Sequence, residues 1–215
     1  MPGLASGAVL TDDPMRVKML AAHYLDGAGL VSENRGMLGY RGRFSRAELG
    51  VFSVGFGESA LLAYLSELSS CGVKRVVYLG ECVSLAADAD TGTIVLAETG
   101  GRPFEAADAA DPALLGGAVN AAKQLKIGAR VLPVLTDDRY FLGGSGAARG
   151  GADIVDFATR ALYRYSLDNG IAAVSILTVT ENVPRGKREN GAFRQSQFHG
   201  ASRLAFETLA GAGFE

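Results

Sequence analysis

The strongest constraint on the fold of this chain is the alternation of short apolar runs with longer segments of helical periodicity. Strands are expected at residues 49–54, 75–79 and 171–180, with weaker candidates at 93–97 and 130–135. Helices are expected at residues 14–26, 59–70, 111–125, 153–168 and 193–210. Because the two patterns alternate and the runs RVVYLG and AAVSILTV are continuously apolar, the sequence favours an α/β fold whose sheet is covered on both faces.

Composition limits the size class and the class of partner. The chain has 215 residues, of which 48% are hydrophobic and 20% are charged, so we expect one globular domain spanning residues 1–215. The 21 basic and 23 acidic residues leave a formal net charge of −2. This balance lacks the basic surface of proteins that bind nucleic acids or membranes. A small molecule or another protein is the expected partner.

The chain gives no sign of a disulfide framework, a metal site or an organic cofactor site. Cys71 and Cys82 are its only cysteines, and neither lies in a CxxC motif or a Cys/His cluster. No apolar run approaches the roughly 18 residues that a membrane helix needs. The first ten residues, MPGLASGAVL, lack the charged flank and long apolar core of a secretory signal. We therefore expect a protein of the reducing cytoplasm.

Polar residues and glycines follow the expected strands. They are GFGES at 55–59, GEC at 80–82 and EN at 181–182. Ligands of α/β proteins gather at the carboxyl ends of strands, so these positions are the first candidates for a site. A glycine-rich stretch at residues 143–151 is expected to form a flexible surface loop.

Short motifs in chain order carry a resemblance to a known family. They are DPMR at 13–16 with NRGMLGY at 34–40, GFG at 55–57 with GVKR at 72–75, AAK at 121–123 with ARV at 129–131, and LTVTEN at 177–182 with FRQ at 193–195. In this register the chain resembles the nucleoside phosphorylases, and specifically the bacterial hexameric purine nucleoside phosphorylases. The resemblance implies a mixed, partly closed central sheet flanked by helices. It also implies cleavage of an N-glycosidic bond by phosphate, and assembly as a trimer of dimers.

The resemblance assigns two catalytic residues on the side of the leaving base. Glu181 stands where the family has an aspartic acid that protonates the purine ring, and Arg194 where it has the arginine paired with that acid. Glutamate keeps the carboxyl group but adds a methylene, which changes its reach. Without the resemblance, Glu181 can equally be interpreted as a surface carboxylate whose negative charge balances the positive charges of Arg185 and Lys187.

Aromatic residues occupy the positions that the resemblance places against the base and the sugar. Tyr140 stands at the position that stacks on the base, and Cys82 and Thr180 are further candidates on the base side. Phe56 and Phe157 replace methionines that lie against the sugar in the family, so a narrower and more rigid pocket is expected. Both phenylalanines also fit ordinary core positions.

The sugar side departs from the family pattern. The family has a Glu-Met-Glu run whose second glutamate grips the ribose 2′ and 3′ hydroxyls, whereas this chain has Asp156, Phe157 and Ala158 there. Alanine cannot accept these hydrogen bonds, and each such bond to a charged group contributes about 1.5 to 3 kcal/mol. Either Asp156 takes over this role or the substrate carries a different sugar.

The phosphate side departs further. Arg16 remains, and so does Arg35, which the resemblance places in the active site of a neighbouring subunit. The family's glycine, third arginine and serine are replaced here by Asp12, Tyr78 and Glu81. Two added carboxylates and one lost cation are expected to weaken phosphate binding.

These departures leave several interpretations open. The first is a divergent enzyme that cleaves the N-glycosidic bond of a nucleoside, which is modified or biosynthetic in one version, with phosphate as the possible co-substrate. The second is a hydrolytic nucleosidase in which Glu81 or Asp12 activates water. A third is a noncatalytic homologue that binds a partner, in which Arg16 and Glu81 form a structural ion pair. In the enzymatic readings the partners are a small-molecule nucleoside and further copies of the chain. Arg35 then makes a dimer the minimal active unit, and a hexamer is expected.

Overall fold

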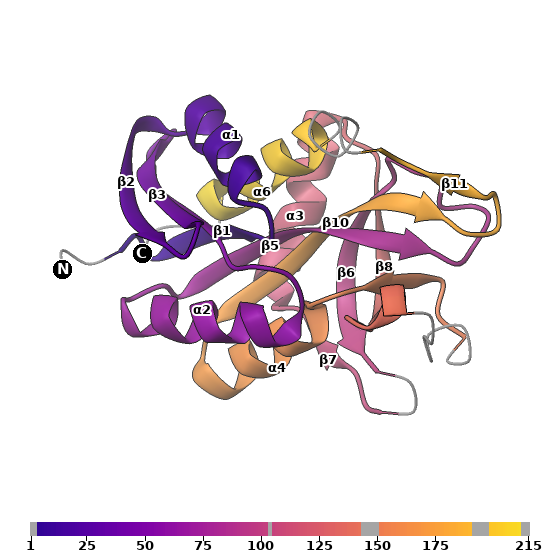
Figure 1. Cartoon of the computed structure of the whole chain (residues 1–215). Helices are drawn as coiled ribbons and strands as arrows, with labels where there is room; N and C mark the ends of the chain where they lie inside the picture. The colour runs from indigo at the N-terminus through magenta and orange to yellow at the C-terminus, as the bar shows by residue number, and fades with distance from the viewer. Residues whose placement is uncertain (1–3, 103–104, 143–150, 191–197, 212–215) are drawn as a thin grey trace.

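A computed structural model of the chain describes residues 4–102, 105–142, 151–190 and 198–211 (Figure 1). Five α-helices of these residues lie around one mixed β-sheet. The helices are α1 (Pro14–Tyr24), α2 (Glu58–Ser70), α3 (Pro112–Leu125), α4 (Thr159–Asn169) and α6 (His199–Gly211), and a 3-10 turn, η1, spans Tyr140–Leu142. The strands are β1 (Gly7–Thr11), β2 (Asp26–Asn34), β3 (Met37–Phe44), β4 (Ala47–Ser53), β5 (Arg75–Ser84), β6 (Ile94–Gly101), β7 (Asp108–Ala109), β8 (Ala129–Thr136), β9 (Ile154–Asp156), β10 (Ala172–Asn182) and β11 (Lys187–Arg188).

The eleven-stranded sheet closes on itself over part of its width. Its order is β11-β10-β6-β8-β9-β5-β1-β4-β3-β2, with β7 paired to β6. Strand β10 pairs with β5 as well as with β6, so β5, β10, β6, β8 and β9 form a closed ring. The remaining strands β1, β4, β3 and β2 extend from β5 as an open sheet. This is the mixed, partly closed α/β sheet that the resemblance implied.

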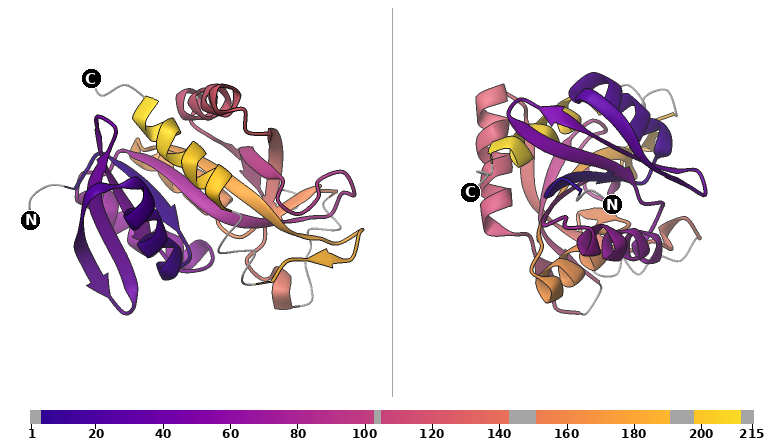
Figure 2. Two further views of the ribbon diagram at one scale, coloured as in Figure 1. Left: turned by 90° about the horizontal axis from the view of Figure 1, so that it is seen from above. Right: turned by 90° about the vertical axis from the view of Figure 1, so that its left-hand side faces the viewer.

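Helices cover both faces of the sheet, as the continuously apolar strands predict. Figures 1 and 2 show α1, α3 and α6 on one side and α2 and α4 on the other. The central strands β5 and β10 run parallel, and most of their side chains are buried between these layers. Tyr163 of α4 ties a helix to this core: its hydroxyl donates to the Ala97 carbonyl at 2.6 Å and accepts from the Ser175 amide at 2.9 Å.

Two of the helices begin with the same local signal. Asp13 precedes Pro14 at the start of α1, and Asp111 precedes Pro112 at the start of α3. The Asp13 carboxylate accepts from the Met15 amide at 2.8 Å, and the Asp111 carboxylate accepts from the Leu114 amide at 2.9 Å. An aspartate cap followed by proline satisfies amides that have no partner within the helix, which fixes both starting points.

The structure corrects three expected boundaries. The helix expected at 153–168 begins only at Thr159, because Ile154 and Val155 are β-branched and pair as β9 with β5 and β8 in the closed ring. The polar residues at 80–82 and 181–182 lie inside β5 and β10 rather than after them. The helix expected at 14–26 ends at Tyr24.

Two expectations fall partly on residues that the structure does not describe. The described part of the helix expected at 193–210 is α6, and residues 193–197 lie outside the described ranges. Residues 143–150 of the expected glycine-rich loop also lie outside them. Among the described helices, none has the length and apolar character needed to cross a membrane.

Candidate active site

Parallel strands bring several of the candidate residues to one edge of the sheet. Strand β5 lies parallel to both β1 and β10, with Leu10 opposite Tyr78 and Thr178 opposite Glu81. Asp12 directly follows β1. Polar groups from segments that are far apart in the sequence therefore meet near the carboxyl ends of these strands, which is where α/β proteins place their sites.

Arg16 is enclosed by acceptors of its own chain. Its Nη1 donates to Thr11 Oγ1 at 2.8 Å and to Asp12 Oδ1 at 2.9 Å, and its Nη2 donates to Glu81 Oε1 at 3.1 Å. The Phe198 ring lies 3.9 Å from the guanidinium carbon, and only 3% of the Arg16 side chain is exposed. Asp12 and Glu81 thus neutralise the cation that the resemblance assigns to phosphate.

Tyr78 and Cys82 lie buried on β5 beside these charges. Burial raises the pKa of Tyr78 well above its usual value, and the nearby Asp12 carboxylate adds to the effect. Burial likewise raises the pKa of the Cys82 thiol, reinforced by Asp156. Both groups stay protonated and neutral at neutral pH. The Tyr78 ring also lies over Gly80, where a Cβ atom would come within 2.5 Å of Tyr78 Cε1.

Asp156 is buried, and both of its carboxylate oxygens have partners. Oδ1 accepts from Thr136 Oγ1 at 2.5 Å, while Oδ2 accepts from the amides of Ala158 at 3.1 Å and Thr159 at 2.7 Å. The carboxylate therefore joins β8 to the first turn of α4. Burial raises its pKa, although these hydrogen bonds act in the opposite direction. Ala158 is buried too.

A β-bulge determines where Glu181 lies. Val179 pairs with Cys82 and Glu181 pairs with the next residue, Val83, so Thr180 is an extra residue in β10. The Thr180 carbonyl accepts from the Glu189 amide at 2.9 Å. This brings β11 alongside, and Arg188 Nε lies 3.5 Å from Glu181 Oε2.

Asn182 anchors the end of the same strand. Its side-chain amide donates to the carbonyls of Ala86 at 3.0 Å and Ala89 at 2.8 Å, and its side-chain oxygen accepts from the Arg185 amide at 3.0 Å. Arg185 and Lys187 both pair with Asp90. In the described residues, the charge that faces Glu181 is accordingly Arg188 rather than Arg185 or Lys187.

Three phenylalanines form what we call the phenyl cluster: Phe56, Phe141 and Phe157. The Phe157 ring lies 5.0 Å from Phe56 and 5.1 Å from Phe141, measured between centroids. Phe157 is only 4% exposed, whereas Phe56 and Phe141 are 49% and 48% exposed. Tyr140 meets Phe141 edge to face at 5.3 Å. Burial raises the Tyr140 pKa, and the charge of Glu181 raises it further, which places the two residues in one electrostatic environment.

The structure thus gathers most of the described candidate residues into two groups. One group is the Arg16 network with Asp12, Glu81 and the neighbouring Tyr78, and the other joins Glu181 to Tyr140 and the phenyl cluster. Arg35 belongs to neither group. Arg35 is exposed in the turn between β2 and β3. Arg194 lies outside the described residues.

Several contributors could not be singled out from the sequence. Thr11, Phe198 and Arg188 contact the candidate residues, but they carry no motif and reach them through tertiary packing or strand pairing. Phe141 could have been identified from the sequence, because it is an aromatic residue that directly follows the candidate Tyr140. No group of three or more metal-ligating side chains was found among the described residues.

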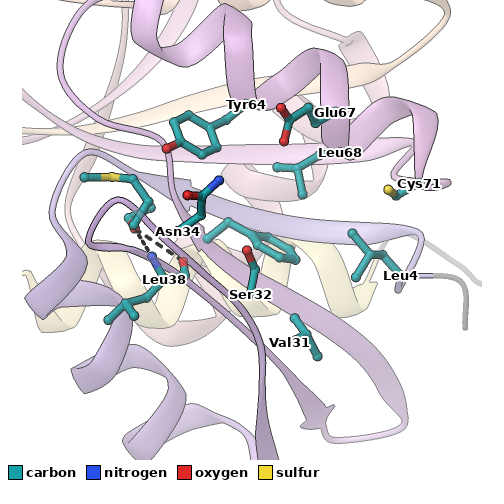
Figure 3. Close-up of a pocket in the computed structure, with 12 residues that line it drawn as sticks. Leu4, Val31, Ser32, Asn34, Leu38, Tyr64, Glu67, Leu68 and Cys71 are labelled. Atoms are coloured by element: carbon teal, nitrogen blue, oxygen red, sulfur yellow. Dashed lines mark hydrogen bonds between the residues drawn. The ribbon is translucent and has the colours of Figure 1, made fainter. Parts of the chain in front are cut away.

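A separate cavity of about 160 Å³ lies away from both groups, between α2 and the strands β2 and β3. Figure 3 shows Tyr64 and Leu68 of α2 facing Val31 and Asn34 of β2 across it. None of the candidate residues lines this cavity.

Comparison with known proteins finds similar chains. No family model matches the chain. It is 29% identical to the purine nucleoside phosphorylase DeoD-type of Bacillus subtilis strain 168, covering 96% of this chain and 95% of that protein. It is also 29% identical to the protein of the same name from Caldanaerobacter subterraneus subsp. tengcongensis, covering 95% of this chain and 94% of the relative. Over nearly its whole length, the chain is therefore similar to purine nucleoside phosphorylases.

A solved structure has the same fold. The purine nucleoside phosphorylase from Toxoplasma gondii, in complex with immucillin-H, superposes with a TM-score of 0.89. The match covers 97% of this chain and 92% of the other at 19% sequence identity. The two chains therefore share the same fold.

Proposed function

We propose that this chain is an enzyme that cleaves the N-glycosidic bond of a purine-type nucleoside, and that water rather than phosphate attacks the sugar. Similarity to enzymes named purine nucleoside phosphorylase over nearly the whole chain supports the bond that is cleaved. The observation that carries the choice of water is the enclosure of Arg16 by Asp12 and Glu81.

Charge balance is the physical reason. Two unit charges about 4 Å apart interact by about 4 kcal/mol near a protein surface. A phosphate dianion beside Arg16 would meet two carboxylates there, and each repels it about as strongly as the single guanidinium attracts it. Arg16 would also have to give up hydrogen bonds of 2.9 and 3.1 Å. Water carries no charge and meets no such repulsion.

The reaction balances with side chains of this chain. The oxygen of a water molecule bonds to the anomeric carbon, and the proton it releases passes to Asp12 or Glu81. The C–N bond breaks and its electron pair goes to the base, which Glu181 stabilises by supplying a proton to the ring. Tyr140 stacks on the base through its ring. The products are a free base and a free sugar.

The assembly is also part of the proposal. Arg35 is exposed at the tip of the β2–β3 hairpin, a position from which a side chain can reach a neighbouring molecule. We expect a homo-oligomer in which two copies form the smallest active unit.

The test is release of free base from purine and pyrimidine nucleosides, followed by chromatography, with and without inorganic phosphate. We expect release without phosphate, with free sugar as the second product. Release that requires phosphate and yields a sugar phosphate would overturn the choice of water. No release from any nucleoside would overturn the enzymatic proposal and favour a noncatalytic binding protein.

A variant pair sharpens this test. Glu81→Ser removes one of the two carboxylates around Arg16, so inorganic phosphate should begin to accelerate base release or compete with substrate. Glu48→Ser is the matched control, because Glu48 belongs to an exposed ion pair with Arg41 on the open sheet. If phosphate affects the Glu81→Ser and Glu48→Ser variants equally little, Glu81 does not exclude it.

A further inference from the structure

The phenyl cluster presents apolar surface next to the proposed reaction centre. Phe56 and Phe141 remain about half exposed although each packs on the buried Phe157. They come from separate parts of the chain, the loop before α2 and the 3-10 turn after β8. Two half-exposed phenyl rings that converge on a third, buried one form a surface suited to an apolar group of a ligand.

The cluster lies between the two polar groups of the site. Phe157 directly follows Asp156, whose charge acts on both Tyr78 and Cys82, as does that of Glu81. At its other end, Phe141 lies 5.8 Å from the guanidinium carbon of Arg188, which pairs with Glu181. A nucleoside whose base meets Glu181 and whose anomeric carbon faces Asp12 and Glu81 has its sugar between these groups. The sugar therefore faces the phenyl cluster.

The two residues that flank Phe157 in the sequence, Asp156 and Ala158, are both buried. Both oxygens of Asp156 are engaged by Thr136 and by the first amides of α4. Ala158 offers no side-chain acceptor. Sugar hydroxyls placed against Asp156 and Ala158 would lose water and gain no carboxylate partner from either residue.

We propose that this site selects nucleosides whose sugar lacks the vicinal 2′ and 3′ hydroxyls, with Phe56, Phe141 and Phe157 as the residues that determine this specificity. The proposal rests on the proposed nucleoside-cleaving function and adds the class of sugar. Each hydroxyl removed from the sugar relieves a desolvation cost, and the exposed methylene groups gain contact with the phenyl rings.

Binding rather than turnover is the right measurement, because removing hydroxyls also changes the intrinsic reactivity of the glycosidic bond. The full-length Glu181→Gln variant slows cleavage and allows calorimetric titration. The ligands are adenosine, 2′-deoxyadenosine, 3′-deoxyadenosine and 2′,3′-dideoxyadenosine, and the inosine series with the same four sugars. In each series we expect both monodeoxynucleosides to have a lower Kd than the riboside. The Kd of the dideoxynucleoside should be the lowest, at least ten-fold below that of the riboside.

A second variant tests the phenyl cluster itself. Phe56→Asn, made in the Glu181→Gln background, replaces an exposed ring by an amide that can bind hydroxyls. This variant should bring the ratio of the riboside Kd to the dideoxynucleoside Kd below three. Leu167→Asn is the matched control, because Leu167 is an exposed apolar residue near the end of α4 outside the cluster. The control should leave the ratio unchanged.

The outcomes separate this proposal from the one on which it rests. If ribosides bind as tightly as dideoxynucleosides or more tightly, the sugar specificity is overturned while the nucleoside-cleaving function stands. An unchanged ratio in Phe56→Asn overturns the role of the phenyl cluster. If no nucleoside of either series binds and base release is also absent, the proposed function fails and the sugar specificity fails with it.

Discussion

Replacing Arg16 by methionine tests whether the network around it is a buried structural unit. Methionine keeps an unbranched apolar side chain but removes the guanidinium, which lies over the Phe198 ring. Asp12 and Glu81 then face each other with only 14% and 13% of their side chains exposed and without the cation between them. The variant therefore isolates the charge contribution from the packing contribution.

The magnitude follows from the geometry. Arg16 makes two charge-assisted hydrogen bonds, at 2.9 and 3.1 Å, with only 3% of its side chain exposed. Breaking a buried ion pair by removing one partner costs about 3 to 5 kcal/mol, because the remaining charges lose their compensation. Removing all three charges in Asp12→Asn, Arg16→Met and Glu81→Gln together should restore the free energy of unfolding to within about 1 kcal/mol of the parent chain.

Urea denaturation followed by circular dichroism measures this loss. With a slope of about 2 to 3 kcal/mol per molar urea, a loss of 3 kcal/mol lowers the midpoint by about 1 M or more. Arg130→Met is the matched control, since Arg130 forms an exposed pair with Asp88 at 3.0 Å and should lose no more than about 1 kcal/mol. If Arg16→Met loses no more stability than Arg130→Met, the guanidinium is not locked in place. The argument against phosphate binding then fails as well.

Three further changes test other parts of the structure. Glu181→Gln should lower base release by about 10²-fold at unchanged melting temperature, and an unchanged rate would remove Glu181 from catalysis. Because burial raises the folded-state pKa of Asp156, its stabilising contribution is fully present below pH 3.8 and is lost as pH rises through the raised value. Urea titrations should therefore show a larger advantage of the parent chain over Asp156→Asn at pH 4 than at pH 7, and a constant difference would contradict the raised pKa. Tyr163→Phe should lower the free energy of unfolding by about 2 kcal/mol in urea, since it leaves the buried Ser175 amide without its acceptor, and a neutral result would mean that another group accepts this hydrogen bond.

The sequence predicted the buried strands better than the exposed strand β2. Strands β4, β5 and β10 are largely buried apolar runs, so hydrophobicity alone identifies them. All nine residues of β2 are exposed and three of them are glycine or alanine near its start, so this strand has no apolar periodicity to find. It forms because β3 pairs with it, and pairing between segments is not a property of either segment alone.

The contacts within the candidate site also depend on tertiary packing that the sequence alone does not reveal. Resemblance and charge identified Arg16, Asp12 and Glu81, and an ion pair between Arg16 and Glu81 was among the interpretations left open. Which oxygen each guanidinium nitrogen reaches, and where the Phe198 ring lies, depend on how α1 packs on β1 and how α6 packs on β5. The partner of Glu181 proved to be Arg188, because a bulge and a short added strand decide which residues lie opposite each other.

The bulge at Thr180 also affects how this protein can be compared with others. If the same residues paired with β5 without the bulge, Thr180 would lie opposite Val83, and Glu181 would lie opposite Ser84 with its carboxylate on the other face of the sheet. Two relatives can therefore have an acidic residue at the same alignment position and still hold it on opposite faces of the sheet. An alignment of this strand should match the bulge first and the acidic residue second.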